Sequence, residues 1–219
     1  CIPRESIEVW GHKSVIEIMD LGRRFRGDGV VGMDLACDEA KYPPNPYLQY
    51  FLPLEGTNLG STVHVDEMGT DEQRRENLAT CILATCTKEL PPELKKRLAH
   101  AIHLWESEEQ MGLARENNIG IERVVCTPMP GCSLDDGHLD VLLKHKVPVA
   151  IVSDDPVLMQ KSLTDNWLAV RDHHDFGEEE FQQMTANALN TAFYRNEAQK
   201  KTVQDKFVKQ GLSRSLLRK

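Results

Sequence analysis

Short apolar runs alternate with longer amphipathic segments along most of the chain. Apolar runs of strand length lie at residues 30–36, 61–65, 97–102, 121–126 and 147–152. Segments compatible with helices lie at residues 6–26, 71–87, 107–117, 134–145, 156–171, 177–192 and 196–211. Prolines between residues 42 and 53 predict that any helix there is short or bent. Five strands, each followed by a helix-compatible segment, predict an α/β protein with a parallel sheet.

Polar side chains gather just after these predicted strands. Asp154 and Asp155 follow the last apolar run, and two adjacent carboxylates at a buried strand end repel each other unless a cation or a shared proton compensates. A divalent metal is the simplest explanation, and His64, at the end of the second run, is a second candidate ligand. Further polar residues lie near the end of a predicted strand or just after it, namely Asp34, Asp38, Glu39, Glu67, His100 and His103. In a (β/α) barrel all these positions converge on one face, where the chemistry takes place.

Length and composition are those of an ordinary globular protein. A chain of 219 residues is long enough for one domain with a sizeable core, and we expect residues 1–219 to form a single domain. The net charge of −8 argues against a general nucleic-acid binder, which would normally carry a basic face. No apolar stretch approaches the roughly 20 residues that span a bilayer, so we expect no membrane partner.

The cysteines indicate reduced thiols rather than a disulfide framework. Six are scattered along the chain without any CxxC pair, and Cys81 and Cys86 lie on one predicted helix in a poor arrangement for zinc or a disulfide. We therefore expect an intracellular, cytoplasmic protein. The chain opens with Cys1 instead of methionine, which suggests a fragment, a processed chain or a renumbered one.

Four motifs, in order, resemble successive motifs of the adenosine/AMP deaminase family of metal-dependent hydrolases. They are Val31-Gly32-Met33-Asp34-Leu35-Ala36-Cys37-Asp38-Glu39, Thr62-Val63-His64-Val65-Asp66-Glu67, Arg97-Leu98-Ala99-His100-Ala101 and Ser153-Asp154-Asp155-Pro156. The resemblance covers roughly residues 6–212, and four ordered motifs are much more specific than any one alone. It implies a (β/α)8 barrel of the TIM type, to which this chain supplies about strands four to eight and the C-terminal helices.

The resemblance also implies an activity, a cofactor and a substrate class. Such enzymes use Zn²⁺ to hydrolyse the exocyclic amine of adenosine or a related purine, giving an inosine-type product and ammonia. His64 and Asp154 would ligate the zinc. Glu67 would protonate the purine ring nitrogen, which requires a pKa raised by burial, and His100 would orient and stabilise the attacking hydroxide.

Two further positions would meet the substrate, and several positions depart from the family pattern. Asp155 would contact the hydroxide and the five-membered ring of the purine. The backbone near Cys37 would meet the purine edge, although a glycine there normally lets the purine approach closely. Where the family usually has His-Ala-Gly-Glu, this chain has His64-Val65-Asp66-Glu67, so Asp66 could disturb the proton affinity of Glu67 or the zinc ligands. Gly-His-Gly is replaced by Ala99-His100-Ala101, and the usual Cys-Pro by Cys126-Thr127-Pro128.

The His-x-His zinc pair of the family's first strand has no counterpart in this sequence. The matching motifs correspond to the fourth through eighth strands, so strands one to three are expected to be missing. A five-strand arc would leave two edges with unpaired backbone groups. We therefore expect an N-terminal part of the barrel, a second chain or copies of this chain to complete it, and to supply the remaining zinc ligands.

Each candidate residue also has an interpretation without function. Asp154 and Asp155 could cap the helix that starts at Pro156, and Glu67 could be a first-turn glutamate of the next helix. His64 and His100, taken singly, are more often core histidines than ligands. Asp38 and Glu39 are interpreted as solvated residues, and His103 and His138 as surface residues. His173 and His174, beside Asp172 and Asp175, could form a metal pair, but a polar connection after a helix is the favoured interpretation.

Three hypotheses follow for the function. The first is a purine deaminase, active once the barrel is complete. The second is a diverged, non-catalytic relative that binds a purine or partners an active copy, which Cys37, Val65 and Asp66 favour. The third is a metal-dependent hydrolase of the same superfamily with another substrate. Retention of His64, Glu67, His100, Asp154 and Asp155 favours the first.

Overall fold

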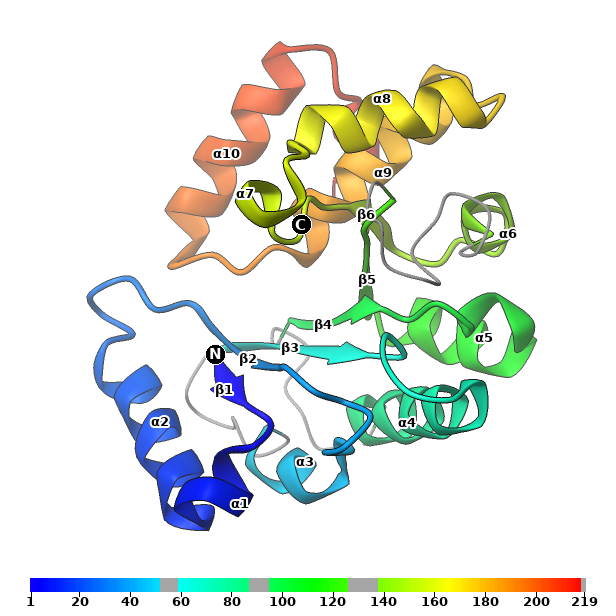
Figure 1. The fold of residues 1–219 in the computed structure, drawn as a ribbon. Helices are drawn as coiled ribbons and strands as arrows, with labels where there is room; N and C mark the ends of the chain where they lie inside the picture. Colours follow the sequence, from blue (N-terminus) through cyan, green and yellow to red (C-terminus); the bar gives the residue numbers. More distant parts are fainter. Residues whose placement is uncertain (52–58, 87–94, 126–137, 218–219) are drawn as a thin grey trace.

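A parallel sheet forms the centre of the protein in the computed structural model, which describes residues 1–51, 59–86, 95–125 and 138–217. Its strands follow one another in chain order: β1 (Ile2–Pro3), β2 (Gly32–Ala36), β3 (Gly60–Val65), β4 (Lys96–His100), β5 (Gly120–Arg123) and β6 (Val149–Ile151). Every neighbouring pair is parallel. The strands form a curved arc with helices α2 to α6 on its outer side (Figure 1), which is the architecture of a partial (β/α)8 barrel.

The helices follow the strands in alternation. They are α1 (Ser6–Trp10), α2 (His12–Arg24), α3 (Asn45–Phe51), α4 (Asp71–Thr85), α5 (Glu108–Glu116), α6 (Leu139–Lys144), α7 (Pro156–Met159), α8 (Leu163–His173), α9 (Glu178–Thr191) and α10 (Glu197–Lys209), with 3-10 turns η1 (Leu104–Glu106) and η2 (Arg214–Leu216). Capping boxes begin α4 at Thr70 and α8 at Ser162, where each side chain accepts a hydrogen bond from the backbone amide three residues on.

The core lies between the strands and the outer helices. On β2, Met33 and Leu35 are buried while Asp34 between them is half-buried, which is the alternation of a strand with two different faces. Met33 packs so closely on α2 that a Cβ at Gly22 would lie 2.4 Å from its sulfur atom. The outward face of the sheet is therefore the apolar one.

The concave face of the sheet carries polar side chains. Arg97 on β4 pairs with Glu122 on β5 at 3.1 Å, and the Thr62 hydroxyl on β3 donates a hydrogen bond to the same carboxylate. Phe193, in the connection from α9 to α10, lies against this layer, with the Arg97 guanidinium 3.9 Å from its ring centroid. A Cβ at Gly60 would lie 2.3 Å from the Phe193 ring, so a glycine makes room for this aromatic ring.

The sheet differs from the sequence prediction at its first edge. All five predicted strands are present, and β1 adds a sixth among the described residues. Its two residues pair with Leu35 and Ala36. A strand of two residues is too short to produce a periodic pattern, so the sequence analysis missed it.

Two predicted helices are each divided. The segment 6–26 breaks at Gly11, whose φ of 75° a glycine adopts without strain. The segment 156–171 breaks at Gln160 (φ 51°), after which the Ser162 capping box starts α8. The third strand ends at His100 rather than at residue 102, because His100 and Ala101 take positive φ angles of 67° and 46°. The predicted Cys126-Thr127-Pro128 motif lies outside the described residues.

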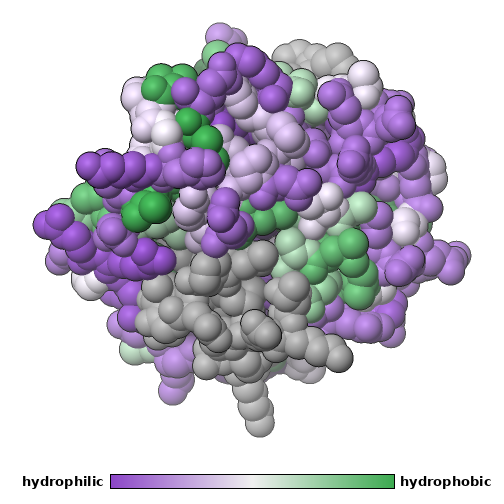
Figure 2. Space-filling model, turned by 90° about the horizontal axis from the view of Figure 1, so that it is seen from below, coloured by the Kyte–Doolittle hydropathy of each residue, from purple (hydrophilic) through white to green (hydrophobic). Residues whose placement is uncertain are grey.

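The surface is mostly hydrophilic. On the face in Figure 2, the residues that are not grey are mostly hydrophilic, with small hydrophobic areas between them. Exposed apolar side chains on the described surface include Trp10, Leu83, Val157 and Leu158. No helix within the described ranges combines the length and apolar character needed to cross a bilayer.

Candidate active site

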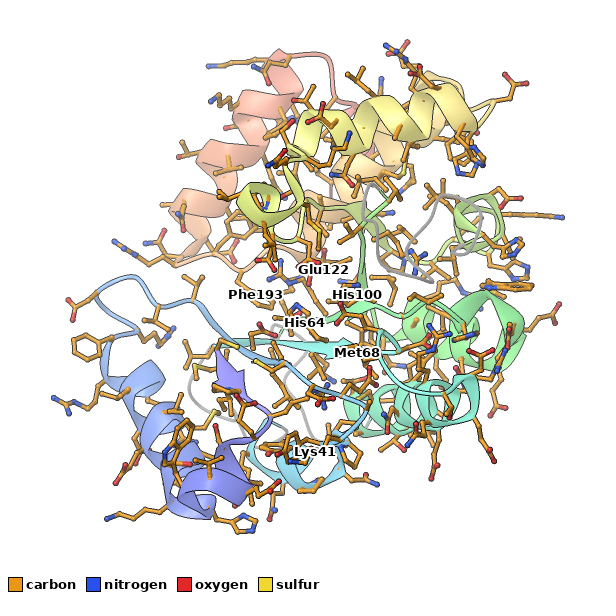
Figure 3. All side chains as sticks on the ribbon, in the orientation of Figure 1. Lys41, His64, Met68, His100, Glu122 and Phe193 are labelled. Carbon is orange, nitrogen blue, oxygen red and sulfur yellow. The ribbon has the colours of Figure 1, made fainter. Side chains whose placement is uncertain are left out.

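A hollow of about 240 Å³ opens at the carboxyl ends of the central strands, and it brings together several of the predicted site residues. His64 near the end of β3, His100 at the end of β4 and Asp154 after β6 all line it, together with Glu122. Figure 3 shows His64, His100 and Glu122 side by side on the concave side of the sheet. Strand-end placement in a parallel barrel produces this convergence.

Three side chains form the tightest cluster. Glu67, His100 and Asp154 each offer one potential ligand atom, and these atoms lie within 4.8 Å of one another. The Glu67 Oε2 and His100 Nε2 atoms are 3.4 Å apart. The His64 ring centroid is 5.4 Å from that of His100. This set of imidazole nitrogens and carboxylate oxygens suits a divalent transition metal.

Burial shifts both carboxyl groups in the same direction. Desolvation raises the pKa of Glu67, and the charges of Asp154 and Glu39 add to the effect against the opposing charge of His64. The pKa of Asp154 is also raised, first by desolvation and then by its neighbour Asp155. Two neighbouring carboxyls that resist ionisation are stabilised by a cation or by a shared proton.

The two histidines differ in their electrostatic environment. Burial, followed by the charges of His64 and Arg123, lowers the pKa of His100 to about 3, so its imidazole is neutral. Burial also lowers the pKa of His64, but the Asp34 hydrogen bond and the charges of Asp34, Glu67 and Asp154 outweigh it, so the net shift is upward.

Asp34 orients His64, a role that the sequence analysis did not assign. Its Oδ1 atom lies 3.0 Å from Nδ1 of His64, and the two residues come from neighbouring strands. If Nδ1 carries the proton and donates it to Asp34, Nε2 remains as the ligating atom. Carboxylates that fix a histidine tautomer in this way are typical of metal sites. The signal in the sequence was the position of Asp34 inside a strand, facing the barrel interior.

Glu39 is buried, with 2% of its surface exposed, so the prediction of a solvated side chain was wrong. Its carboxylate accepts hydrogen bonds from the backbone amides of Asp66 (3.0 Å), Glu67 (2.9 Å) and Met68 (3.3 Å), and from the Asn77 side chain (2.9 Å). Neighbouring Asp38 is exposed, as predicted. Glu39 therefore anchors the turn that carries Glu67.

Asp66 is fully buried and engages His103, which the sequence analysis had interpreted as a surface residue. Its Oδ1 atom lies 2.6 Å from Nδ1 of His103, and its Oδ2 atom accepts the His103 backbone amide. Desolvation raises the pKa of Asp66, while these hydrogen bonds oppose the shift. The sequence analysis allowed that Asp66 could disturb the expected zinc ligands. In the structure both of its carboxylate oxygens contact His103 instead.

Arg4 is a further residue that the sequence analysis missed. Its guanidinium is completely buried and donates hydrogen bonds to the carbonyl oxygens of His64 and Tyr42. Burial lowers the pKa of Arg4, opposed mainly by the charge of Glu39. Arg4, which directly follows β1, thereby fixes the carbonyl group of His64 near the end of β3.

The two remaining predicted site residues lie at exposed positions. Cys37 has a φ of 82°, in the region that favours glycine, and burial followed by the charge of Glu5 raises the pKa of its thiol. Asp155 occupies the N-cap position of α7, but its side chain makes no capping hydrogen bond. The helix-capping interpretation of this acidic pair therefore finds no side-chain hydrogen bond to support it.

His138, His173 and His174 lie in aromatic contacts and do not line the hollow. His138 is half-buried rather than a free surface residue, and its ring centroid is 3.8 Å from that of Trp105. His174 stacks on Phe176 at 4.5 Å, and His173 is exposed. These contacts agree with a polar connection after α8 rather than with a metal pair.

A parallel arc that gathers imidazoles and carboxylates at its strand ends places the chain in the class of (β/α)-barrel proteins with a candidate metal site at the carboxyl ends of the strands. The particular family follows from the sequence comparison: the family profile described as adenosine deaminase matches residues 7–210. The chain therefore belongs to the adenosine deaminase family.

Individual relatives agree with this membership. The chain is 26% identical to an adenosine deaminase from Danio rerio over 209 residues, which cover 91% of this chain and 54% of that protein. It is 27% identical to an adenine deaminase from Vibrio parahaemolyticus over 173 residues, covering 78% and 48%. The chain thus spans about half the length of the curated relatives that it matches.

Solved structures share the fold. An amidohydrolase from Burkholderia ambifaria with bound zinc superposes with a TM-score of 0.76 at 16% identity, covering 95% of this chain and 55% of that one. An N6-mAMP deaminase from Arabidopsis superposes with a TM-score of 0.74 at 21% identity, covering 95% and 57%. At these identities the likeness establishes the partial barrel fold.

Proposed function

We propose that this chain is the C-terminal part of a zinc-dependent hydrolase that deaminates adenosine or a related purine to the inosine-type product and ammonia. One observation carries the proposal. Glu67, His100 and Asp154 come from three different strand ends, yet their ligand atoms lie within 4.8 Å of one another. Family membership and relatives named as adenosine and adenine deaminases support the purine as substrate.

His64 and Asp154 are the proposed zinc ligands. They line the same hollow, the Asp34 contact suits a His64 tautomer that ligates through Nε2, and the raised pKa of Asp154 reflects a carboxylate that a cation would stabilise. A zinc ion held there would supply the Lewis acidity that makes water nucleophilic near neutral pH. Catalytic zinc has at least three protein ligands, so we assign the others to the part of the barrel that completes the arc.

Glu67 is the proposed proton donor to the purine ring nitrogen. Its burial favours the protonated carboxyl, as a general acid near neutral pH requires. Because its pKa is lowered to about 3, the His100 imidazole is neutral and can hydrogen-bond the nucleophile in its uncharged form. Asp155 and the backbone at Cys37 are proposed to meet the purine itself.

The proposed partner is an N-terminal barrel segment or a second chain. β1 and β6 are the two edges of the described arc, and closure of a barrel removes such edges. We propose that residues 1–219 form a single domain together with the part that completes the barrel. We also propose that the complete protein is cytoplasmic. Neither a nucleic acid nor a membrane is part of the proposal.

The test is ammonia release from adenosine, adenine and AMP by the full-length protein loaded with zinc. We expect Glu67→Gln to lower kcat by about 100-fold or more, because general acid catalysis contributes about 10² to 10⁴. Since burial raises the pKa of Glu67, the wild-type rate should fall as pH rises through that pKa and the acid loses its proton. Glu76→Gln, on the exposed face of α4, is the matched control and should leave the rate unchanged.

The outcomes separate the three hypotheses. Zinc-loaded protein that releases ammonia from none of the three purines would favour a hydrolase with another substrate. Protein that binds no zinc but still binds a purine or a partner would favour the non-catalytic hypothesis.

A further inference from the structure

One turn carries Glu67 and is held by buried carboxylates on two sides. The Glu39 carboxylate accepts hydrogen bonds from the backbone amides of residues 66–68, and these bonds fix the turn to the segment after β2. Asp66, inside the turn, reaches in the other direction to His103. The turn is therefore tied to both neighbouring strand ends at once.

His103 lies three residues after His100, in the segment that turns away from β4. The contact between Asp66 and His103, here called the Asp66–His103 pair, therefore spans two loops that each carry a site residue. On one side of the pair is Glu67, next to Asp66 in the chain. On the other is His100, whose Nε2 atom is 3.4 Å from the Glu67 carboxylate.

We propose that Asp66 and His103 are positioning residues that hold the Glu67 carboxyl against the His100 imidazole. The inference rests on the proposed function, in which Glu67 protonates the purine ring nitrogen and His100 hydrogen-bonds the nucleophile that attacks the same ring. Proton transfer requires heavy atoms within roughly 2.6–3.2 Å, and a misplacement of about 1 Å can cost about 100-fold in rate. A buried pair with two contacts fixes such a distance better than an exposed one, because water does not compete for its hydrogen bonds.

The backbone of Asp66 makes a clean substitution possible. Its φ of 65° lies in the left-handed region, where glycine is unstrained. Asp66→Gly therefore removes the carboxylate while favouring the same turn. His103→Ala removes the partner, and His103→Asn keeps a nitrogen donor close to the position of Nδ1.

The experiment uses the full-length, zinc-loaded protein with adenosine. Asp66→Gly and His103→Ala should each lower kcat by about 10- to 100-fold with little change in KM and with zinc content unchanged. His103→Asn should stay within about threefold of wild type. The double variant Asp66→Gly/His103→Ala should be no slower than the slower single variant, because both remove one contact.

Arg75→Gln is the matched control. Arg75 on α4 and Glu106 in η1 form a bidentate ion pair at 2.6 and 2.8 Å, which joins the same two regions at the surface. Breaking it should leave kcat unchanged. The proposal is overturned if Asp66→Gly keeps wild-type kcat, if His103→Asn is as slow as His103→Ala, or if Arg75→Gln is equally slow.

A second readout does not depend on activity. Amide hydrogen exchange in a peptide covering residues 66–68 should be faster in Asp66→Gly and His103→Ala than in wild type, and unchanged in Arg75→Gln. Wild-type protein that releases no ammonia would refute the proposed function, while faster exchange would still support the positioning role. Unchanged exchange in both pair variants would refute that role whatever the activity.

Discussion

At the scale of single residues, the carboxylates of Glu39 and Asp66 are buried beside the candidate site. Both accept hydrogen bonds from backbone amides. A buried carboxylate is costly unless its oxygens accept hydrogen bonds, and both satisfy this condition. These hydrogen bonds hold the turn at residues 66–68 in one conformation, and this fixes the position of the side chain that the turn carries. The acid Glu67 is thus positioned by groups that have no direct part in the proposed chemistry.

Asp34 leads to a prediction at the same scale. Asp34→Asn retains the shape of the side chain but weakens the acceptor for Nδ1 of His64, and we expect zinc affinity to fall by about 10- to 100-fold. Competition with a chromophoric chelator measures it. Asp38→Asn is the control, since Asp38 is exposed and follows the same strand. Equal affinity of Asp34→Asn and wild type would remove Asp34 from the site.

Sequence could locate the central residues but not their supports. His64, Glu67, His100 and Asp154 stand at strand ends in recognisable motifs, and a parallel barrel brings strand ends together. Glu39 and His103 gave no such signal, because the burial of an acidic or imidazole group depends on which loop packs over it. Asp66 seemed intrusive for the same reason: its partner lies 37 residues away.

Elements from opposite ends of the sequence meet on the concave face of the sheet. Phe193 follows α9, yet its ring lies against β2 and β3 at two glycines, Gly32 and Gly60. The C-terminal helices are therefore part of the barrel rather than an appendage. Helix and strand order was predictable from hydrophobic periodicity, whereas this contact was not, since neither a single aromatic residue nor a single glycine carries a period.

The prediction at element scale concerns this contact. Gly60→Ala should destabilise the full-length protein by about 1–3 kcal/mol, because its Cβ would overlap the Phe193 ring. Urea unfolding measures the change. Gly60→Ala/Phe193→Ala should cost less than the sum of the two single variants.

Gly112→Ala is the matched control for that experiment. In the middle of α5, its Cβ would meet only an arginine side chain at 3.8 Å, and alanine is the better helix former by about 0.5–1 kcal/mol. This variant should be at least as stable as wild type. Additive losses for the Gly60 and Phe193 variants would contradict the proposed overlap.

The whole molecule is an arc with β1 at one edge and β6 at the other. Unpaired backbone groups at sheet edges promote association, so residues 1–219 expressed alone should self-associate as concentration rises. Light scattering measures the mass. Addition of the proposed segment or chain that completes the barrel should give a mass independent of concentration. A constant mass of 24.8 kDa for residues 1–219 alone would contradict this prediction.

The position of Phe193 late in the chain has a consequence for biosynthesis. Ribosomes produce the N-terminal strands first, and domains tend to fold in that order. All six described strands precede Phe193 in the chain, so Arg97 and Glu122 are synthesised before the aromatic ring that packs against this layer. Packing of Phe193 against Arg97 is consequently a late event, and a chain truncated before Phe193 would leave the charged side chains on the concave face more accessible to water.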